Sequence, residues 1–276
     1  MTADGGPKRG STRMRILFIG DIVGKPGRRA LEGLLKKVVS EYEIEFTVAN
    51  GENAAGGMGL TPSIALEIFE EGVQVLTSGN HIWAKKEIIP FLNEEPRILR
   101  PANYPAQVPG RGLGTFGASK GIKVAVLNLE GRVFMKNLDC PFRVAEREIE
   151  RVKRETNIIL VDFHAEATSE KVAMGRFLKG KVSAVLGTHT HVQTSDERIL
   201  DGGTAYITDV GMTGPSASVI GVREEVALER FLTQIPLKYD VAAGEVELQG
   251  VVFEVDPETG RSTEIRRIRI PLNERG

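Results

Sequence analysis

Short apolar runs alternate with amphipathic segments through most of the chain. Each run of about five apolar residues predicts a buried strand, and these runs occupy residues 15–19, 44–49, 73–77, 157–161, 182–186 and 204–208. Apolar residues at helical spacing predict helices between them, over residues 28–40, 83–92, 142–154 and the segment that starts at Thr61 and Pro62. The alternation of strand, loop and helix is typical of an α/β fold.

The C-terminal part of the chain has a different pattern. Residues 231–239, 245–255 and 263–270 alternate between polar and apolar side chains, which predicts half-buried antiparallel strands. No segment resembles a long linker, so we expect residues 14–276 to form one domain. Residues 1–13 lack apolar periodicity and are expected to form a disordered, mildly basic tail.

The composition is that of an ordinary globular chain of 276 residues, with 41% hydrophobic and 26% charged residues. Its formal net charge of -1 gives no overall attraction to nucleic acid, so we expect no extended nucleic-acid surface. No run reaches the roughly 18 apolar residues of a membrane span, and the N-terminus lacks a signal-peptide pattern. We therefore expect a cytoplasmic protein that contacts no membrane. The single cysteine, Cys140, has no disulfide partner.

Polar side chains that can bind a metal follow the predicted strands. Asp21 follows the first strand, Glu52 the second and Asn80 the third. The chain has four histidines, and each follows an apolar run: His81, His164, His189 and His191. Ligands in open α/β sheets gather at the carboxyl ends of the strands, so these side chains should converge. In extended backbone, His189 and His191 would point to the same side.

The glycine-rich loop after the first strand does not match a nucleotide-binding motif. Its glycines, Gly20, Gly24 and Gly27, lack the spacing of a dinucleotide-binding loop, and Asp21 would face a pyrophosphate. A Walker loop is excluded as well, because Pro26 stands where Ser or Thr should follow the lysine. A carboxylate directly after a central strand is better suited to a cation.

The candidate ligands are carboxylates, an amide and imidazoles, without a thiolate. This set suits iron, manganese, zinc or cobalt better than it suits a closed structural zinc site. It also holds more donors than one four-coordinate ion needs. Two metal ions bridged by a carboxylate would clamp a phosphoryl group and lower the pKa of a bridging water into the neutral range. The pattern therefore indicates hydrolysis, with a non-coordinating histidine as the proton donor for the leaving group.

A set of ordered motifs carries a resemblance to a known family. The motifs are Gly20-Asp21, Gly51-Glu52-Asn53, Gly79-Asn80-His81, His164 and Gly187-Thr188-His189-Thr190-His191. In this order they resemble the motifs of the calcineurin-like metallophosphoesterases, and among these the bacterial branch of small phosphodiesterases that hydrolyse 2',3'-cyclic nucleotides. The resemblance implies an α/β/β/α sandwich, in which two mixed β-sheets are flanked by helices.

The resemblance also implies which residues bind metal. The first metal would be held by Asp21, Glu52 and His191. The second metal, bridged by Glu52, would be held by Asn80, His164 and His189. The broader superfamily usually has Asp-x-His in its first motif and Asp as the bridge, whereas Val23 and Glu52 stand at those positions here. The implied cofactors are two divalent or mixed-valence metal ions, iron or manganese first, with zinc or cobalt as alternatives.

Two further residues would act on the substrate. By resemblance, His81 would be the acid or transition-state donor, and Asn53 would contact a phosphate oxygen. We therefore expect a dinuclear metal-dependent phosphodiesterase that hydrolyses a small phosphodiester, specifically 2',3'-cyclic nucleotides, by a metal-bridging hydroxide. The alternative is a metal-bound regulatory or RNA-binding protein, or a ribonuclease, that contacts RNA through the tail and residues 266–269. The sequence leaves a homo-oligomer open.

Overall fold

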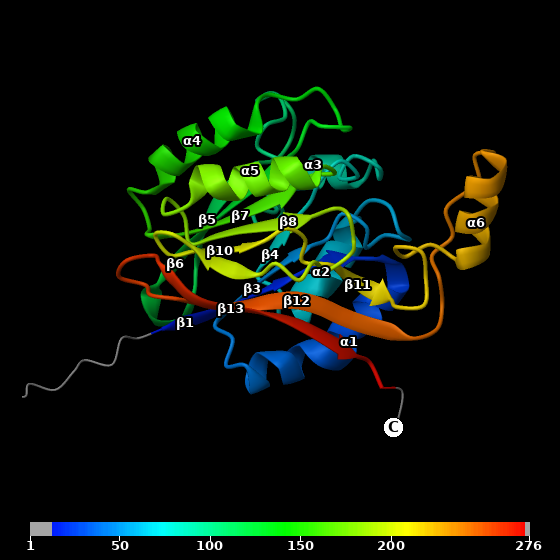
Figure 1. The fold of residues 1–276 in the computed structure, drawn as a ribbon, viewed down its shortest axis with the longest axis horizontal. Helices are drawn as coiled ribbons and strands as arrows, with labels where there is room; N and C mark the ends of the chain where they lie inside the picture. Colours follow the sequence, from blue (N-terminus) through cyan, green and yellow to red (C-terminus); the bar gives the residue numbers. More distant parts are fainter. Residues whose placement is uncertain (1–12, 274–276) are drawn as a thin grey trace, which may run out of the picture.

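Two mixed β-sheets packed face to face form the centre of the molecule, which the computed structural model describes from residue 13 to residue 273. Helices cover the outer face of each sheet (Figure 1). The apolar side chains accordingly form three clusters, one between the sheets and one under each helical layer. The predicted α/β/β/α sandwich is confirmed.

The first sheet has seven strands, with β1 at its centre between β3, which is parallel to it, and β12, which is antiparallel. Its strands are β1 (Met14–Ile19), β2 (Asp21–Ile22), β3 (Phe46–Asn50), β4 (Val75–Thr77), β11 (Met212–Pro215), β12 (Val246–Val255) and β13 (Ser262–Pro271). The antiparallel pairing of β12 with β13 confirms the alternating pattern read near the C-terminus.

The second sheet has six strands in the order β5-β6-β7-β8-β10-β9, and its four central strands are parallel. These strands are β5 (Leu113–Gly117), β6 (Lys123–Glu130), β7 (Ile158–His164), β8 (Ala184–Thr188), β9 (Arg198–Leu200) and β10 (Thr204–Ile207). The parallel strands end at one edge of this sheet, because parallel pairing aligns their carboxyl ends.

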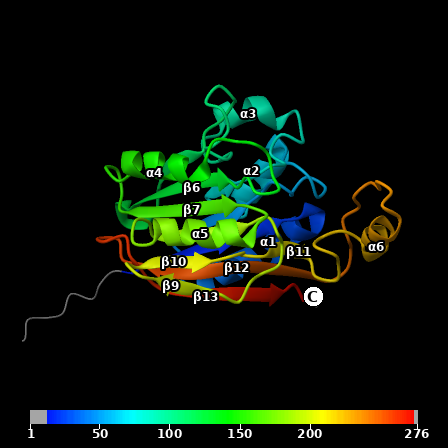
Figure 2. The same cartoon turned by 45° about the horizontal axis from the view of Figure 1, so that its top comes forward.

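The helices are α1 (Gly24–Glu41), α2 (Pro62–Glu70), α3 (Ile88–Glu94), α4 (Pro141–Val152), α5 (Thr168–Leu178) and α6 (Glu224–Thr233), and Ser119–Gly121 forms a short 3-10 turn. α1, α2 and α3 pack on the first sheet, and α4 and α5 pack on the second. α6 stands apart from the sandwich on an arm of the chain (Figure 2). Among the residues described, no helix has the length and apolar character needed to cross a membrane.

Strand β1 shows how the sequence builds these layers. Its side chains alternate between the two faces of the sheet, as strand geometry requires. Leu17 and Ile19 join the cluster under α1 and α2, whereas Ile16 and Phe18 join the cluster between the sheets. All are fully buried, which explains why β1 is a continuous apolar run rather than an alternating one.

Several boundaries differ from the sequence prediction. The first helix begins at Gly24, before the expected start at residue 28, and the third begins at Ile88 rather than at residue 83. Residues 79–87 instead form turns, in which Ile82 N donates to Gly79 O at 3.3 Å. The expected tail of residues 1–13 lies outside the described residues except for Arg13, which forms an ion pair with Glu254.

The strand predicted over residues 231–239 is wrong. The first part of this segment belongs to α6, and the remainder is irregular. Glu224 and Glu225 lie in the first turn of α6 and Arg230 in its last turn, and both placements favour a helix through its dipole. All three charged residues precede residue 231. The alternation within residues 231–239, taken without them, therefore indicated a strand instead of the end of a helix.

Candidate metal centre

The candidate ligands converge where strands of both sheets end. Asp21 lies in β2 and His164 is the last residue of β7. Glu52 lies two residues after the end of β3, and Asn80 lies three residues after the end of β4. The remaining candidates lie in loops that adjoin these strand ends: Asn53, His81, His189 and His191. Every candidate residue contacts at least one other in the group, through the hydrogen bonds and ion pairs given below.

Glu52 lies in the middle of the group and is completely buried. Its Oε1 atom is 3.0 Å from His164 Nε2 and 3.6 Å from His81 Nδ1. Its Oε2 atom accepts a hydrogen bond of 2.9 Å from the backbone N–H of His81. The carboxylate is thus held by backbone on one oxygen, while the other oxygen faces imidazoles.

Two buried carboxylate oxygens of the candidate ligands lack a hydrogen bond within residues 13–273: Asp21 Oδ1 and Glu52 Oε1. Asp21 is completely buried, and its other oxygen accepts a 3.2 Å hydrogen bond from the backbone N–H of His189. An unpaired buried acceptor is costly, and a carboxylate in this condition suits a bound cation. The donor set therefore fits a metal.

A group of potential ligand atoms surrounds these oxygens. One atom each from Glu52, His164 and His189 lies within 4.8 Å of the other two. The rings of His164 and His189 meet edge to face, with centroids 4.6 Å apart. Asn80 Oδ1 lies 3.2 Å from His164 Nε2. One cation could therefore contact carboxylate, imidazole and amide at once.

The ring of His164 is fixed by polar residues buried behind it. Thr188 Oγ1 lies 2.9 Å from His164 Nδ1 and donates to Asp162 Oδ1 at 2.7 Å. Asn50 Nδ2 donates to the other oxygen of Asp162 at 3.3 Å. Because Thr188 donates its hydroxyl proton to Asp162, its oxygen accepts from His164 Nδ1–H, and Nε2 is the ring nitrogen that faces Glu52.

Asn50 and Thr188 are not among the residues predicted to form the site, although both are polar residues at the ends of apolar runs. Gly79 also contributes through its lack of a side chain. A Cβ at that position would lie 2.0 Å from His164 Cδ2, so only glycine lets the loop after β4 approach the ring this closely.

His81, Asn53 and His191 form a second connected group. Asn53 Oδ1 lies 2.8 Å from His81 Nδ1, and Asn53 Nδ2 lies 3.3 Å from His191 Nε2. His191 Nδ1 lies 2.9 Å from the carbonyl oxygen of Ile220 and donates to it. With Nδ1 engaged in this way, Nε2 of His191 faces Asp21 Oδ1 at a distance of 3.6 Å. The His81 side chain is 31% exposed, so it can reach a ligand in solution.

The imidazoles have opposite pKa shifts. Burial lowers the pKa of His164, but the carboxylates of Glu52 and Asp21 outweigh it and raise the pKa to about 9. Burial and the neighbouring His164 lower the pKa of His189 to about 3. Burial alone would raise the pKa of Glu52, but His164 and His81 lower it. Shifts this strong in a cleft are typical of a functional site.

The backbone of the His-Thr-His segment is not extended as predicted. Strand β8 ends at Thr188, and the chain then turns with φ values of 96° at His189 and 63° at His191. His189 Nε2 lies 3.1 Å from Glu166 Oε2, whereas His191 faces Asp21. The two imidazoles therefore face different carboxylates.

A cavity of about 410 Å³ opens onto these residues. We call it the metal cavity, and its polar lining includes Glu52, Asn53, His81, Glu166, His189 and His191. Its apolar lining includes Val23, Met58, Tyr239 and Val241, with Asp240 among them. A cavity of this size, with several polar groups in an otherwise apolar lining, suits a small organic ligand.

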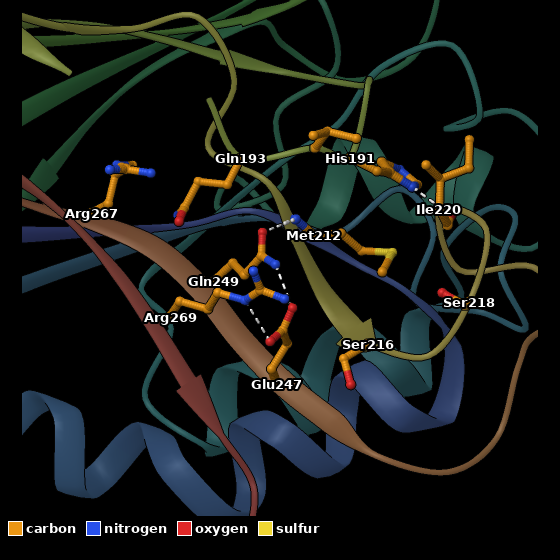
Figure 3. A pocket seen from close by; sticks show the side chains of 11 residues that line it. His191, Gln193, Met212, Ser216, Ser218, Ile220, Glu247, Gln249, Arg267 and Arg269 are labelled. Atoms are coloured by element: carbon orange, nitrogen blue, oxygen red, sulfur yellow. Dashed lines mark hydrogen bonds and ion pairs between the residues drawn. The ribbon is translucent and has the colours of Figure 1, made fainter. Parts of the chain in front are cut away.

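A second cavity of about 480 Å³ shares His191 and Ile220 with the first (Figure 3). We call it the arginine pocket, after Arg267 and Arg269 in its wall. Arg269 Nε lies 2.8 Å from Glu247 Oε2, and Gln249 Nε2 donates to Glu247 Oε1 at 2.6 Å. Arg267 Nε lies 2.8 Å from Glu197 Oε2. Both guanidinium groups are therefore already paired with carboxylates.

Comparison with known proteins shows which family the chain matches. A family model described as YmdB-like protein matches residues 17–268. A relative from Bacillus subtilis (strain 168), named 2',3'-cyclic-nucleotide 2'-phosphodiesterase, is 49% identical over 257 residues. The match covers 93% of this chain and 97% of the relative.

Solved structures agree with the fold. A protein from Thermus thermophilus, described as hypothetical, has a TM-score of 0.87 at 41% identity, and the match covers 94% of this chain and 99% of that one. A structure described as a novel phosphatase from Mycoplasma pneumoniae has a TM-score of 0.89 at 35% identity, with coverages of 95% and 94%. The resemblance read from the motifs is confirmed, and the chain belongs to the YmdB-like family.

Proposed function

We propose that this chain is a dinuclear metal-dependent phosphodiesterase that hydrolyses small phosphodiesters, with 2',3'-cyclic nucleotides as its substrates. The observation that carries the proposal is the pair of buried carboxylate oxygens, on Asp21 and Glu52, that lack hydrogen bonds and face imidazoles. The name of the Bacillus subtilis relative supports the substrate class.

The proposed ligand sets follow the two sides of the centre. Asp21, Glu52 and His191 would hold one ion. Glu52, Asn80, His164 and His189 would hold the other. When bound, the ions would polarise the phosphoryl oxygens and activate a water as the nucleophile. Oxygen and imidazole donors without thiolate favour iron or manganese, with zinc or cobalt as alternatives.

His81 is proposed as the proton donor for the leaving alkoxide. Its Nδ1 atom is engaged by Asn53 Oδ1 at 2.8 Å, which leaves Nε2 for the substrate. The side chain lines the metal cavity and is 31% exposed, as a group that meets substrate must be. Asn53, whose amide lies between His81 and His191, is placed to donate to a phosphate oxygen.

The apolar wall of the metal cavity suits the base and ribose of a nucleotide. Tyr239 offers an aromatic face, and Val241 and Met58 add aliphatic surface beside it. A charged phosphate would lie toward the polar wall, while the base would replace water on the apolar wall. This division favours a small organic phosphodiester over inorganic phosphate.

The regulatory and RNA-binding alternative receives less support. Its expected contact surface includes Arg266, Arg267 and Arg269. Arg267 and Arg269 are paired with Glu197 and Glu247, and Arg266 stacks on Tyr42 at 4.4 Å. Arginines held in this way offer less free charge to a phosphate backbone. The cytoplasmic location and the homo-oligomer remain predictions from the sequence.

Hydrolysis of 2',3'-cyclic AMP by metal-stripped protein, before and after manganese is added back, tests the proposal. We expect turnover to return with manganese and to be absent in His189→Ala, which removes one ligand. Arg267→Met, in the neighbouring arginine pocket, is the control and should keep its turnover. Bound manganese without hydrolysis of any cyclic nucleotide, together with salt-sensitive RNA binding, would instead support the regulatory alternative.

A further inference from the structure

A lysine and an aspartate form a buried ion pair next to the loop that carries His189 and His191. Lys171 lies on α5 and its side chain is 2% exposed, and Asp209, which follows β10, is completely buried. Lys171 Nζ lies 2.7 Å from Asp209 Oδ2. Neither residue lines the metal cavity, so neither can touch a substrate there.

The pair is bonded to the residue between two proposed metal ligands. Asp209 Oδ2 accepts hydrogen bonds from the backbone N–H of Thr190 at 3.1 Å and from its hydroxyl at 2.6 Å. Lys171 Nζ also donates to Thr190 Oγ1, at 3.1 Å. Asp209 Oδ1 accepts from the backbone N–H of Gly211 at 2.8 Å, which fixes the carboxylate itself. Thr190 is therefore held through both its backbone and its side chain.

The residues on either side of Thr190 are in strained conformations. His189 and His191 both have positive φ, a region that residues other than glycine seldom adopt. Such conformations persist only where the surrounding structure holds them in place. The bonds from Thr190 to the buried pair are well placed to do this, because they fix the peptide groups that join the two histidines.

We propose that Lys171 and Asp209 are positioning residues for the metal centre, an inference that rests on the proposed function. They hold Thr190 so that His189 and His191 turn to opposite sides and present their Nε2 atoms to different ions. A buried ion pair is costly to desolvate, and apolar residues of similar size often replace one without loss of stability. Its value here lies in fixing Thr190 at one position and orientation.

The test measures manganese affinity by direct titration of the metal-stripped protein. The variants are Asp209→Asn, Thr190→Val and the double variant Lys171→Met with Asp209→Asn. The double variant leaves no unpaired buried charge, so it should fold even if the single aspartate variant does not. We expect Asp209→Asn and the double variant to bind manganese about 10- to 100-fold more weakly. Thr190→Val should show a smaller loss in the same direction.

The control is Arg15→Met, which breaks the ion pair with Glu254 near the start of β1, at the other end of the strand from Asp21. It should alter thermal stability while leaving manganese affinity unchanged. A double variant that folds and binds manganese as tightly as the unmodified protein would overturn the positioning role. Unmodified protein that binds manganese without hydrolysing a cyclic nucleotide would contradict the proposed function alone, since affinity is measured without turnover.

Discussion

The metal cavity and the arginine pocket share His191 and Ile220 in their linings, but the carboxylates near them have different partners. In the arginine pocket, Arg267 and Arg269 are each matched by a glutamate, and Gln249 adds a further bond to Glu247. Glu52 in the metal cavity and Asp21 beside it are buried, and each has an oxygen that accepts no hydrogen bond from the described residues and faces an imidazole, at 3.0 Å and 3.6 Å. The carboxylates beside the arginine pocket thus face guanidinium groups, whereas those of the metal centre face imidazoles.

The hydrogen bonds of buried carboxylates can therefore help to distinguish a binding site from a structural polar cluster. Buried polar groups in folded proteins are nearly always satisfied, so an unsatisfied carboxylate points to a missing ligand. The number of charged residues does not distinguish the two cavities. What distinguishes them is the kind of partner that each carboxylate has: a permanently charged guanidinium in the arginine pocket, and an imidazole that can also bind a metal in the metal centre.

The largest expected effect comes from replacing the central carboxylate. Glu52→Gln removes the charge that would bridge two ions, and we expect kcat/KM for 2',3'-cyclic AMP to fall by roughly 1000-fold or more. Steady-state kinetics at saturating manganese measures this. Glu247→Gln, the same substitution in the arginine pocket, is the matched control. Equal losses in both variants would contradict the distinction between the cavities.

Glu130 sharpens the comparison because it is a buried carboxylate beside the centre whose oxygens also lack hydrogen bonds. Burial raises its pKa from 4.5 to about 7, so Glu130 binds a proton at pH values where an ordinary glutamate is ionised. A raised pKa means that the ionised form is disfavoured in the folded protein. The contribution of Glu130 to the free energy of unfolding should therefore be fully present below pH 4.5 and should fall as the pH rises toward 7.

Denaturant unfolding of metal-stripped protein at several pH values, compared with Glu130→Gln, measures this effect. The difference in unfolding free energy between the two proteins should change by roughly 3 kcal/mol from pH 4.5 to pH 7, in favour of the variant. A difference that stays constant with pH would show that Glu130 ionises normally.

The next effect separates the proposed acid from the proposed ligands. His81→Ala should lower kcat by about 100-fold while leaving manganese affinity unchanged, since general acids contribute on this order. Parallel kinetics and metal titration measure the two quantities. Loss of manganese from this variant would make His81 a ligand instead.

The smallest effect is expected in the arginine pocket. Arg269 is 63% exposed, and its ion pair with Glu247 is worth no more than about 1 kcal/mol at such a site. Arg269→Met should therefore change kcat/KM less than about twofold. A large loss, measured with 2',3'-cyclic AMP as substrate, would mean that this pocket takes part in substrate binding.

Much of the fold could be predicted from the sequence because the strands are nearly all apolar. The run at residues 15–19 forms β1, and α2 begins where expected, with Thr61 Oγ1 accepting from Ile64 N at 3.3 Å. The placement of Asp21, Glu52 and His164 at strand ends followed from the rule that parallel strands present ligands at one edge.

Other features depended on contacts between distant residues. The backbone turns at His189 and His191, and the residue between them is hydrogen-bonded to Asp209, 19 residues further along the chain. Likewise, nothing in the local sequence shows that the ammonium group of Lys171 is buried against Asp209. Contacts between residues distant in the sequence determine the surroundings of such side chains, and the local pattern of apolar and polar residues does not indicate these contacts.

Manganese binding to metal-stripped protein tests the central claim most directly. The stoichiometry would be measured by titration with quantitative metal analysis, for the unmodified chain and for Asp21→Asn. The account predicts two ions per chain in the unmodified protein and loss of at least one in the variant. Binding of no manganese, or binding that is identical in the variant, would contradict the assignment of the unpaired carboxylates to a metal centre.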